Sequence, residues 1–173
     1  SGEILNCKFS NNYAKNNGGG LSYTTYSYSG EGMAGFDNFE TVNGTLALDE
    51  TTEITGNTAE GYGGGIYFSV SPITVSGTSP RTIFKNKSNQ RYEISLEIDG
   101  TRITGNSAKK AGGGLYVQRR TDIYISNFRM YYGTVSGNST DTYGGGLYIK
   151  SSTEGNTSIV GVCPYPPSAM NVD

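Results

Sequence analysis

The chain has 173 residues, which is enough for one domain with a sizeable core. Its hydrophobic fraction of 34% is low for a compact two-layer globule and fits an elongated molecule with a narrow core better. Charged residues make up 16% and the net charge is -2, so the sequence has no excess of positive charge that would favour binding to a nucleic acid or an anionic membrane surface. Histidine, the commonest general base and metal ligand, is absent, and no apolar run approaches the ~18 residues of a membrane-spanning helix.

A repeated motif, N-x-[A/T]-x-x-x-G-G-G, organises the chain. Its copies align without gaps, and each is bounded by an apolar residue on both sides. In chain order the copies occupy residues 9–21, 54–66, 103–115 and 135–147. The glycines fall at fixed offsets within these copies and show no collagen-like period of three. A fixed repeat of this kind predicts a solenoid.

The first half of each copy predicts a strand followed by a turn. The opening residue is β-branched or aromatic and is expected to point inward, while the Ser or Thr after it should face outward. The asparagines that follow form one column: Asn12, Asn57, Asn106 and Asn138. We expect them at the turn, because Asn tolerates left-handed dihedrals and bonds its own backbone. In stacked coils these side chains would form an amide ladder.

The second half of each copy predicts another strand. The three glycines permit positive φ and close approach of backbones. An apolar-x-apolar strand then begins at Leu21, Ile66, Leu115 and Leu147. A further strand is expected upstream of the last three copies, where apolar residues alternate at 46–48, 96–98 and 128–130. Three strands per repeat predict an all-β fold, the right-handed parallel β-helix.

The spacing of the copies bears on the number of coils. The first glycines of successive triplets are 45, 49 and 32 residues apart. Because a solenoid coil takes about 20 residues or more, the last interval is one coil with a loop, whereas the first two fit either two coils or one coil with a long excursion. The segment from Thr24 to Asn43 has the composition of a long loop, which favours one coil with an excursion. The segment from Pro72 to Ile98 contains strand-like stretches, which favours an additional coil. We therefore expect five to seven coils.

The ends of the chain differ from the repeat. We expect the β-helix to span residues 1–150 and residues 151–173 to form a C-terminal cap or tail, because the run Cys-Pro-Tyr-Pro-Pro cannot supply the N–H groups of a central strand. The chain enters a repeat by about Leu5 without a polar cap, so we expect it to be a piece of something longer. Cys7 and Cys163 lie near opposite ends, so no disulfide between them is expected, and Cys7 has the alternate spacing of a small buried residue.

The motif resembles the repeats of bacterial right-handed β-helix surface proteins, including the chlamydial polymorphic outer membrane proteins, which pair F-x-x-N with G-G-A-[I/L/V]. Phe9-Ser10-Asn11-Asn12 matches the first tetrapeptide, whereas the other copies read ITGN, ITGN and VSGN, and all have GGG in place of GGA. The resemblance implies secretion or display on the cell surface. It also implies attachment to a protein or glycan of a host or neighbouring cell, usually as the passenger of a larger protein.

One column is a candidate ligand-binding site. The second residue after the triple glycine is Tyr67, Tyr116 and Tyr148 in the last three copies and Ser22 in the first. By two-residue alternation these rings would line an outer face. Exposed aromatic rings can bind sugars or proteins through their faces. The alternative is a cross-strand stack that only stabilises the sheet.

Polysaccharide lyases and hydrolases also use parallel β-helices, with acidic clusters that hold calcium or perform acid–base chemistry. The candidates here are Glu97, Asp99, Arg102, Arg119, Asp122 and Asp141. They are scattered, and no acidic column recurs between copies. We therefore expect no catalytic residue, metal ligand or cofactor.

The sequence favours a non-catalytic extracellular or cell-surface module that acts in adhesion or as a structural element of a surface assembly. Contacts are expected first in the long excursions at 24–43 and 69–89, because loops vary while coils must repeat. A carbohydrate-active enzyme and a subunit that assembles end to end through unpaired strand edges stay open as alternatives.

Overall fold

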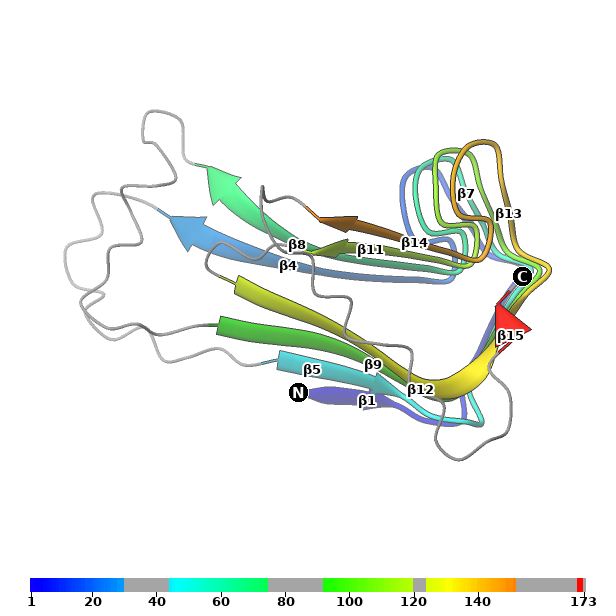
Figure 1. Cartoon of the computed structure of the whole chain (residues 1–173), viewed down its shortest axis with the longest axis horizontal. Helices are drawn as coiled ribbons and strands as arrows, with labels where there is room; N and C mark the ends of the chain where they lie inside the picture. Colours follow the sequence, from blue (N-terminus) through cyan, green and yellow to red (C-terminus); the bar gives the residue numbers. More distant parts are fainter. Residues whose placement is uncertain (30–43, 75–91, 120–123, 152–170, 173) are drawn as a thin grey trace.

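The computed structural model describes residues 1–29, 44–74, 92–119, 124–151 and 171–172. These residues are all-β and form three parallel sheets, to each of which successive coils contribute neighbouring strands. The chain winds as a parallel β-helix (Figure 1), as the repeat predicts. Each of the first four ranges forms one coil, and residues 171–172 begin another.

Sheet A opens each coil. It contains β1 (Gly2–Ile4), β5 (Gly44–Leu48), β9 (Tyr92–Thr104), β12 (Tyr124–Ser136) and β15 (Asn171–Val172), with β2 (Lys8–Ser10) and β6 (Glu53–Thr55) beside them. The first two coils split this sheet into two short strands, whereas β9 pairs with both β5 and β6 as one long strand. Figure 1 shows how β12 bends along its length. The upstream strands predicted at 46–48, 96–98 and 128–130 therefore lie side by side in register.

Sheets B and C complete each coil. Sheet B consists of two-residue strands: β3 (Tyr13–Ala14), β7 (Thr58–Ala59), β10 (Ser107–Ala108) and β13 (Ser139–Thr140). Sheet C contains β4 (Leu21–Ser29), β8 (Ile66–Thr74), β11 (Leu115–Arg119) and β14 (Leu147–Ser151). The strands of each sheet pair in parallel, so one motif copy lies directly against the next.

The core lies between sheets A and C and is built from columns of equivalent residues. Ile103 is paired in register with Ile54 on one side and Val135 on the other, and all three are at most 1% exposed. Leu115 lies in the same way between Ile66 and Leu147 on sheet C. Burying an Ile, Leu or Val side chain contributes about 1.5–3 kcal/mol, so these columns are the main force that holds the coils together.

The turn before each asparagine differs from the sequence prediction. Positive φ occurs one residue earlier, at Asn11 (56°), Gly56 (66°), Gly105 (64°) and Gly137 (60°). The ladder asparagines are not among the positive-φ residues, so the left-handed conformation assigned to them was wrong. The preceding residue takes the turn, and this leaves the asparagine side chain free to point along the coil axis.

The triple glycine performs both predicted tasks, each at a different position of the triplet. Only the first glycine of each triplet has positive φ, as at Gly63 (67°). The second is required by contact: a Cβ built on Gly64 would overlap the carbonyl oxygens of Ser107 and Gly113 in the next coil. The third, such as Gly65, faces the ladder amide of Asn106. Backbones of adjacent coils therefore touch where a side chain would separate them.

Within the described residues, the coil count falls below the expected five to seven. Since each motif copy pairs directly with the next, every interval between copies is a single coil. The described residues make four coils and the start of a fifth, in which Val172 pairs with Val135. The expected excursions also begin later than Thr24 and Ser69, because β4 continues to Ser29 and β8 to Thr74. Their remaining parts, and Cys163, lie outside the described residues; Cys7 is half-buried.

Candidate functional site

The asparagine column runs along the coil axis as a chain of hydrogen bonds. Asn57 Nδ2 donates to Asn106 Oδ1 at 3.0 Å, and Asn106 Nδ2 donates to Asn138 Oδ1 at 2.9 Å. Each acceptor oxygen also receives a backbone N–H: that of Asn57 in the first case and that of Asn106 in the second, both at 2.9 Å. Asn57 and Asn106 are fully buried.

The second amide hydrogen is also used. Asn57 Nδ2 donates to the carbonyl oxygen of Phe9, and Asn106 Nδ2 donates to that of Ile54, each at 2.9 Å. An interior ladder amide thus donates two bonds and accepts two, which leaves it no capacity for a ligand. The column therefore has a structural role, and the site has to be sought on the outer faces.

The tyrosine column lies on the outer side of sheet C. Tyr116 is paired in register with Tyr67 and Tyr148. Its ring centroid is 5.4 Å from that of Tyr67 and 5.6 Å from that of Tyr148, with interplanar angles of 16° and 17°. Ser22 continues the column beside Tyr67. Three rings are therefore stacked along the coil axis.

The middle ring is covered rather than open. Tyr116 is only 2% exposed, whereas Tyr67 and Tyr148 are half-buried. Burial, followed by the nearby Tyr67, Tyr62 and Tyr148, raises the pKa of Tyr116 to about 12. The expectation of an exposed ring thus fails for Tyr116, because side chains from another part of the motif pack over it.

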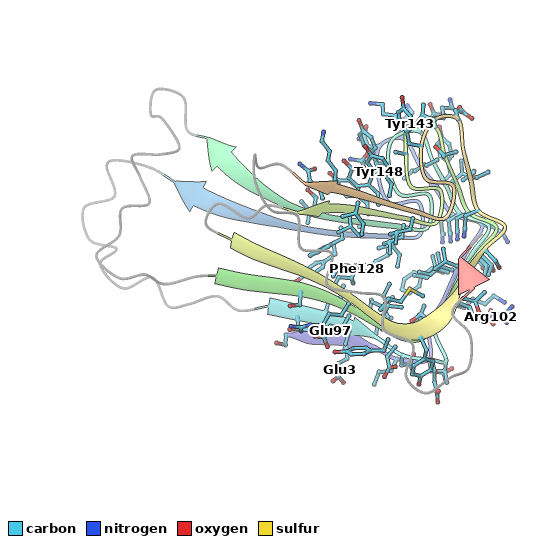
Figure 2. All side chains as sticks on the ribbon, in the orientation of Figure 1. Glu3, Glu97, Arg102, Phe128, Tyr143 and Tyr148 are labelled. Carbon is cyan, nitrogen blue, oxygen red and sulfur yellow. The ribbon has the colours of Figure 1, made fainter. Side chains whose placement is uncertain are left out.

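Those side chains belong to the column directly before the triple glycine, which the sequence interpretation passed over. Tyr62 packs on Tyr116 with centroids 4.6 Å apart, and Tyr143 lies 6.3 Å from Tyr148. Tyr143 is 69% exposed, and Figure 2 shows it with Tyr148 on the same side of the molecule, above β14. Ala111 bridges Tyr62 and Tyr143 in this column. The signal was a Tyr-Gly-Gly-Gly run in the second and fourth copies.

A hollow of about 310 Å³ opens at this place on the surface. Its lining is Tyr62, Lys110, Ala111, Tyr116, Thr142, Tyr143, Tyr148 and Lys150. We call the five rings Tyr62, Tyr67, Tyr116, Tyr143 and Tyr148 the tyrosine cluster. Lys110 Nζ lies 5.3 Å from the centre of the Tyr62 ring, within cation–π range. The hollow thus combines four tyrosines, the hydroxyl-bearing Thr142 and two ammonium groups.

The acidic and basic candidates do not converge in the described part of the chain. Arg102 Nη1 is 3.0 Å from Glu53 Oε1, and Arg129 Nη1 is 2.6 Å from Glu97 Oε1. Figure 2 shows Glu97 on the outer side of sheet A, on the opposite side of the molecule from the tyrosine cluster. Asp99 and Asp141 are exposed, while Asp122 and the Arg119 side chain lie outside what the structure describes. No group of three or more metal-binding side chains occurs among the described residues.

A further acidic residue lies in the turn between β5 and β6. Asp49 accepts hydrogen bonds from the hydroxyls of Thr51 and Thr52, at 2.5 and 2.6 Å, and from the backbone N–H of Asn6. These bonds, that from Thr51 most of all, lower the pKa of Asp49. The carboxylate fixes a turn, so its shifted pKa has a structural cause.

Two segments of the chain, residues 6–24 and 51–69, match the Chlamydia polymorphic membrane protein repeat. Both segments contain a motif copy from its asparagine to its triple glycine. No helix among the described residues is long and apolar enough to cross a membrane. No curated protein and no solved structure matches the chain. Its first two coils are therefore similar to the repeats of the chlamydial polymorphic membrane proteins.

Proposed function

We propose that the chain is a non-catalytic, cell-surface or secreted β-helix module that acts in adhesion. The repeat match supports this proposal, because the matched repeat comes from polymorphic membrane proteins of Chlamydia. The asparagine and glycine columns within the matched segments serve turns, coil contacts and ladder bonds. Recognition therefore falls to positions that differ between coils.

The observation that carries the proposal is the tyrosine-lined hollow on the outer face of sheet C. Aromatic side chains with two rotatable bonds give large contact areas at low entropic cost, which suits recognition. The described carboxylates of Glu53, Glu60 and Glu97 are instead ion-paired with neighbouring cations at 2.6–3.3 Å. Glycoside hydrolysis needs two carboxyl groups on either side of the scissile bond. These glutamates, each held by a cation, do not form such a pair.

The test is adherence of coated beads to cells. Fluorescent beads carrying the chain and matched beads carrying albumin are applied to cultured epithelial cells. We expect more retention of the coated beads and loss of that retention when free chain is added. Equal retention of both kinds of bead would contradict the proposal.

An activity assay separates the enzyme alternative. The chain is incubated with pectate, alginate and hyaluronan, and new reducing ends and unsaturated products are measured. We expect neither to increase over the buffer control. Product formation that follows the amount of chain would favour a carbohydrate-active enzyme instead.

A second candidate is a structural element that assembles end to end. Within the described residues no group donates to Asn12 Oδ1, and the backbone N–H of Asn138 has no acceptor. These are the acceptor and the donor with which interior members of the ladder join adjacent coils. A second copy stacked head to tail would join Asn138 to Asn12 in the same way once its β2 takes the place of β15 beside the end of β12.

Sedimentation velocity over a wide range of concentrations tests this candidate. Assembly predicts a sedimentation coefficient that rises with concentration, and a smaller rise for Asn12→Leu, which removes the acceptor. A concentration-independent monomer would exclude end-to-end assembly.

A further inference from the structure

The hollow lies beside the smallest described member of a repeated column. In the column before the triple glycine, Ala111 lies between Tyr62 and Tyr143 on the neighbouring coils. The Tyr62 ring leans toward the coil of Ala111 and packs on Tyr116 with centroids 4.6 Å apart, whereas the Tyr143 ring lies 6.3 Å from that of Tyr148. Ala111 is 3% exposed, so the hollow lies beside this residue, along the Tyr62, Tyr143 and Tyr148 side chains.

The lining of the hollow is rich in aromatic side chains. Tyr62, Tyr143 and Tyr148 line the hollow, and Tyr116, which is 2% exposed, supports the Tyr62 ring from beneath. The faces of aromatic rings carry partial negative charge and attract the polarised C–H bonds of a sugar ring. The volume of about 310 Å³ is at the lower end for ligand sites, which fits a single ring rather than an extended peptide.

The rim is cationic. Lys110 and Lys150 line the hollow, both are exposed, and neither forms an ion pair within the described part of the chain. No carboxylate is among the lining residues. The nearby acids face other cations: Glu60 binds Lys109 at 2.8 Å, and Asp141 also acts electrostatically on Lys109. Two ammonium groups are thus available to an anion in the hollow.

We propose that this hollow binds a pyranose ring that carries a carboxylate, such as a uronic acid or sialic acid unit of a glycan. The sugar ring packs on Tyr62, Tyr143 and Tyr148, and its carboxylate pairs with Lys110 and Lys150. The inference deepens the adhesion proposal, on which it rests, by naming the ligand chemistry of the outer face.

The probes are 3′-sialyllactose and tri-galacturonic acid, with lactose as the neutral control. Binding to the whole chain is measured by calorimetry and by saturation-transfer NMR. We expect at least one acidic probe to bind and lactose to bind about tenfold more weakly or not at all. Binding should weaken as salt is raised, because the ion pairs lie at the surface. Absence of binding for both acidic probes, or equal binding of lactose, overturns the inference.

The decisive variant is Ala111→Tyr. It adds a third ring beside Tyr62 and Tyr143, and because Ala111 is only 3% exposed, this ring or the Tyr62 ring that it displaces has to occupy the hollow. We expect affinity for the acidic probe to fall about tenfold or more. Ala111→Ser keeps the hollow and should keep the affinity. The melting curve shows whether Ala111→Tyr is folded. If the folded variant binds the probe with unchanged affinity, the sugar does not bind in the hollow.

The charge requirement is tested separately. Lys110→Gln and Lys150→Gln should each lower the affinity for the acidic probe roughly two- to fivefold. Lys109→Gln is the matched control, because Lys109 pairs with Glu60 away from the hollow, and it should change nothing. An equal effect of all three variants would show that only net charge matters and would overturn the site.

The bead assay distinguishes this inference from the proposed function. If the chain binds no acidic sugar but its beads adhere to cells, the inference fails and the adhesion proposal stands. If the chain binds the sugar but its beads do not adhere, adhesion fails and the site stands.

Discussion

Asn57 Oδ1 accepts two hydrogen bonds from Asn12, one from its backbone N–H at 2.9 Å and one from its Nδ2 at 3.0 Å. The same pair of bonds recurs from Asn57 to Asn106 and from Asn106 to Asn138. Each asparagine therefore joins the backbone of one coil to the side chain of the next. Interior members of the ladder should matter more for stability than members at its end.

Asn106→Ala should lower the free energy of unfolding by about 2–3 kcal/mol, because the buried N–H groups of Asn57 lose their acceptor. Asn12→Ala is the matched control. Asn12 is exposed and only donates within the ladder, so this change should cost at most about 1 kcal/mol. Urea denaturation measures both. Equal losses would mean that the ladder does not carry the coil contact.

Gly64→Ala and Gly105→Ala separate the two uses of glycine. Gly105 has a φ of 64° and no atom closer than 3.9 Å to an added Cβ, so its substitution should cost about 1–2 kcal/mol of backbone strain. At Gly64 a Cβ overlaps backbone oxygens of the next coil, so the coils must separate. Gly64→Ala should therefore be the more damaging change in thermal melts. The reverse order would contradict the close approach of the coils.

Acid should weaken the turn at Asp49. Its pKa is lowered by the hydroxyls of Thr51 and Thr52, so the stability it provides is present above about pH 4 and is lost as pH falls through the lowered pKa. Asp49→Asn should lower the Tm near neutral pH and reduce its dependence on acid. Asp141→Asn, at an exposed carboxylate, is the control and should behave as the wild type.

High pH should destabilise the fold through ionisation of Tyr116. Its pKa of about 12 lies above the ordinary ~10, so the linked stability is complete below about pH 10 and is lost as pH rises through about 12. Titration of tyrosinate absorbance should show a late step that disappears in Tyr116→Phe. Tyr131→Phe removes the hydroxyl of an exposed tyrosine and should leave that step in place. A late step that survives Tyr116→Phe would assign it to another tyrosine.

Much of the fold follows from the sequence because strand alternation and a repeat are local signals. The inward positions of Ile54, Ile103 and Val135 and the start of strands at Leu115 and Leu147 follow from two-residue alternation and the motif. The number of coils does not, since the pattern does not tell a long excursion from an extra coil. In the structure, each motif copy pairs directly with the next, and this pairing shows that one interval is one coil.

The candidate site was only half predictable for a related reason. The column of Tyr67, Tyr116 and Tyr148 follows from alternation along one strand. Burial of Tyr116 depends on Tyr62, which lies in another column and on another coil. Such a contact arises only once the coils are in register and the segment before the glycines lies over sheet C.

The column that contains Tyr62, Ala111 and Tyr143 also sets where a ligand can be held along the rod. Adjacent coils are spaced by ~4.8 Å. Exchanging the residues at 62 and 111 would therefore move the hollow by one coil along the axis. Distances between sites on this face can therefore take only whole multiples of the coil rise. A longer array of the same repeat could match the spacing of units in a polymer by single substitutions that leave the backbone unchanged.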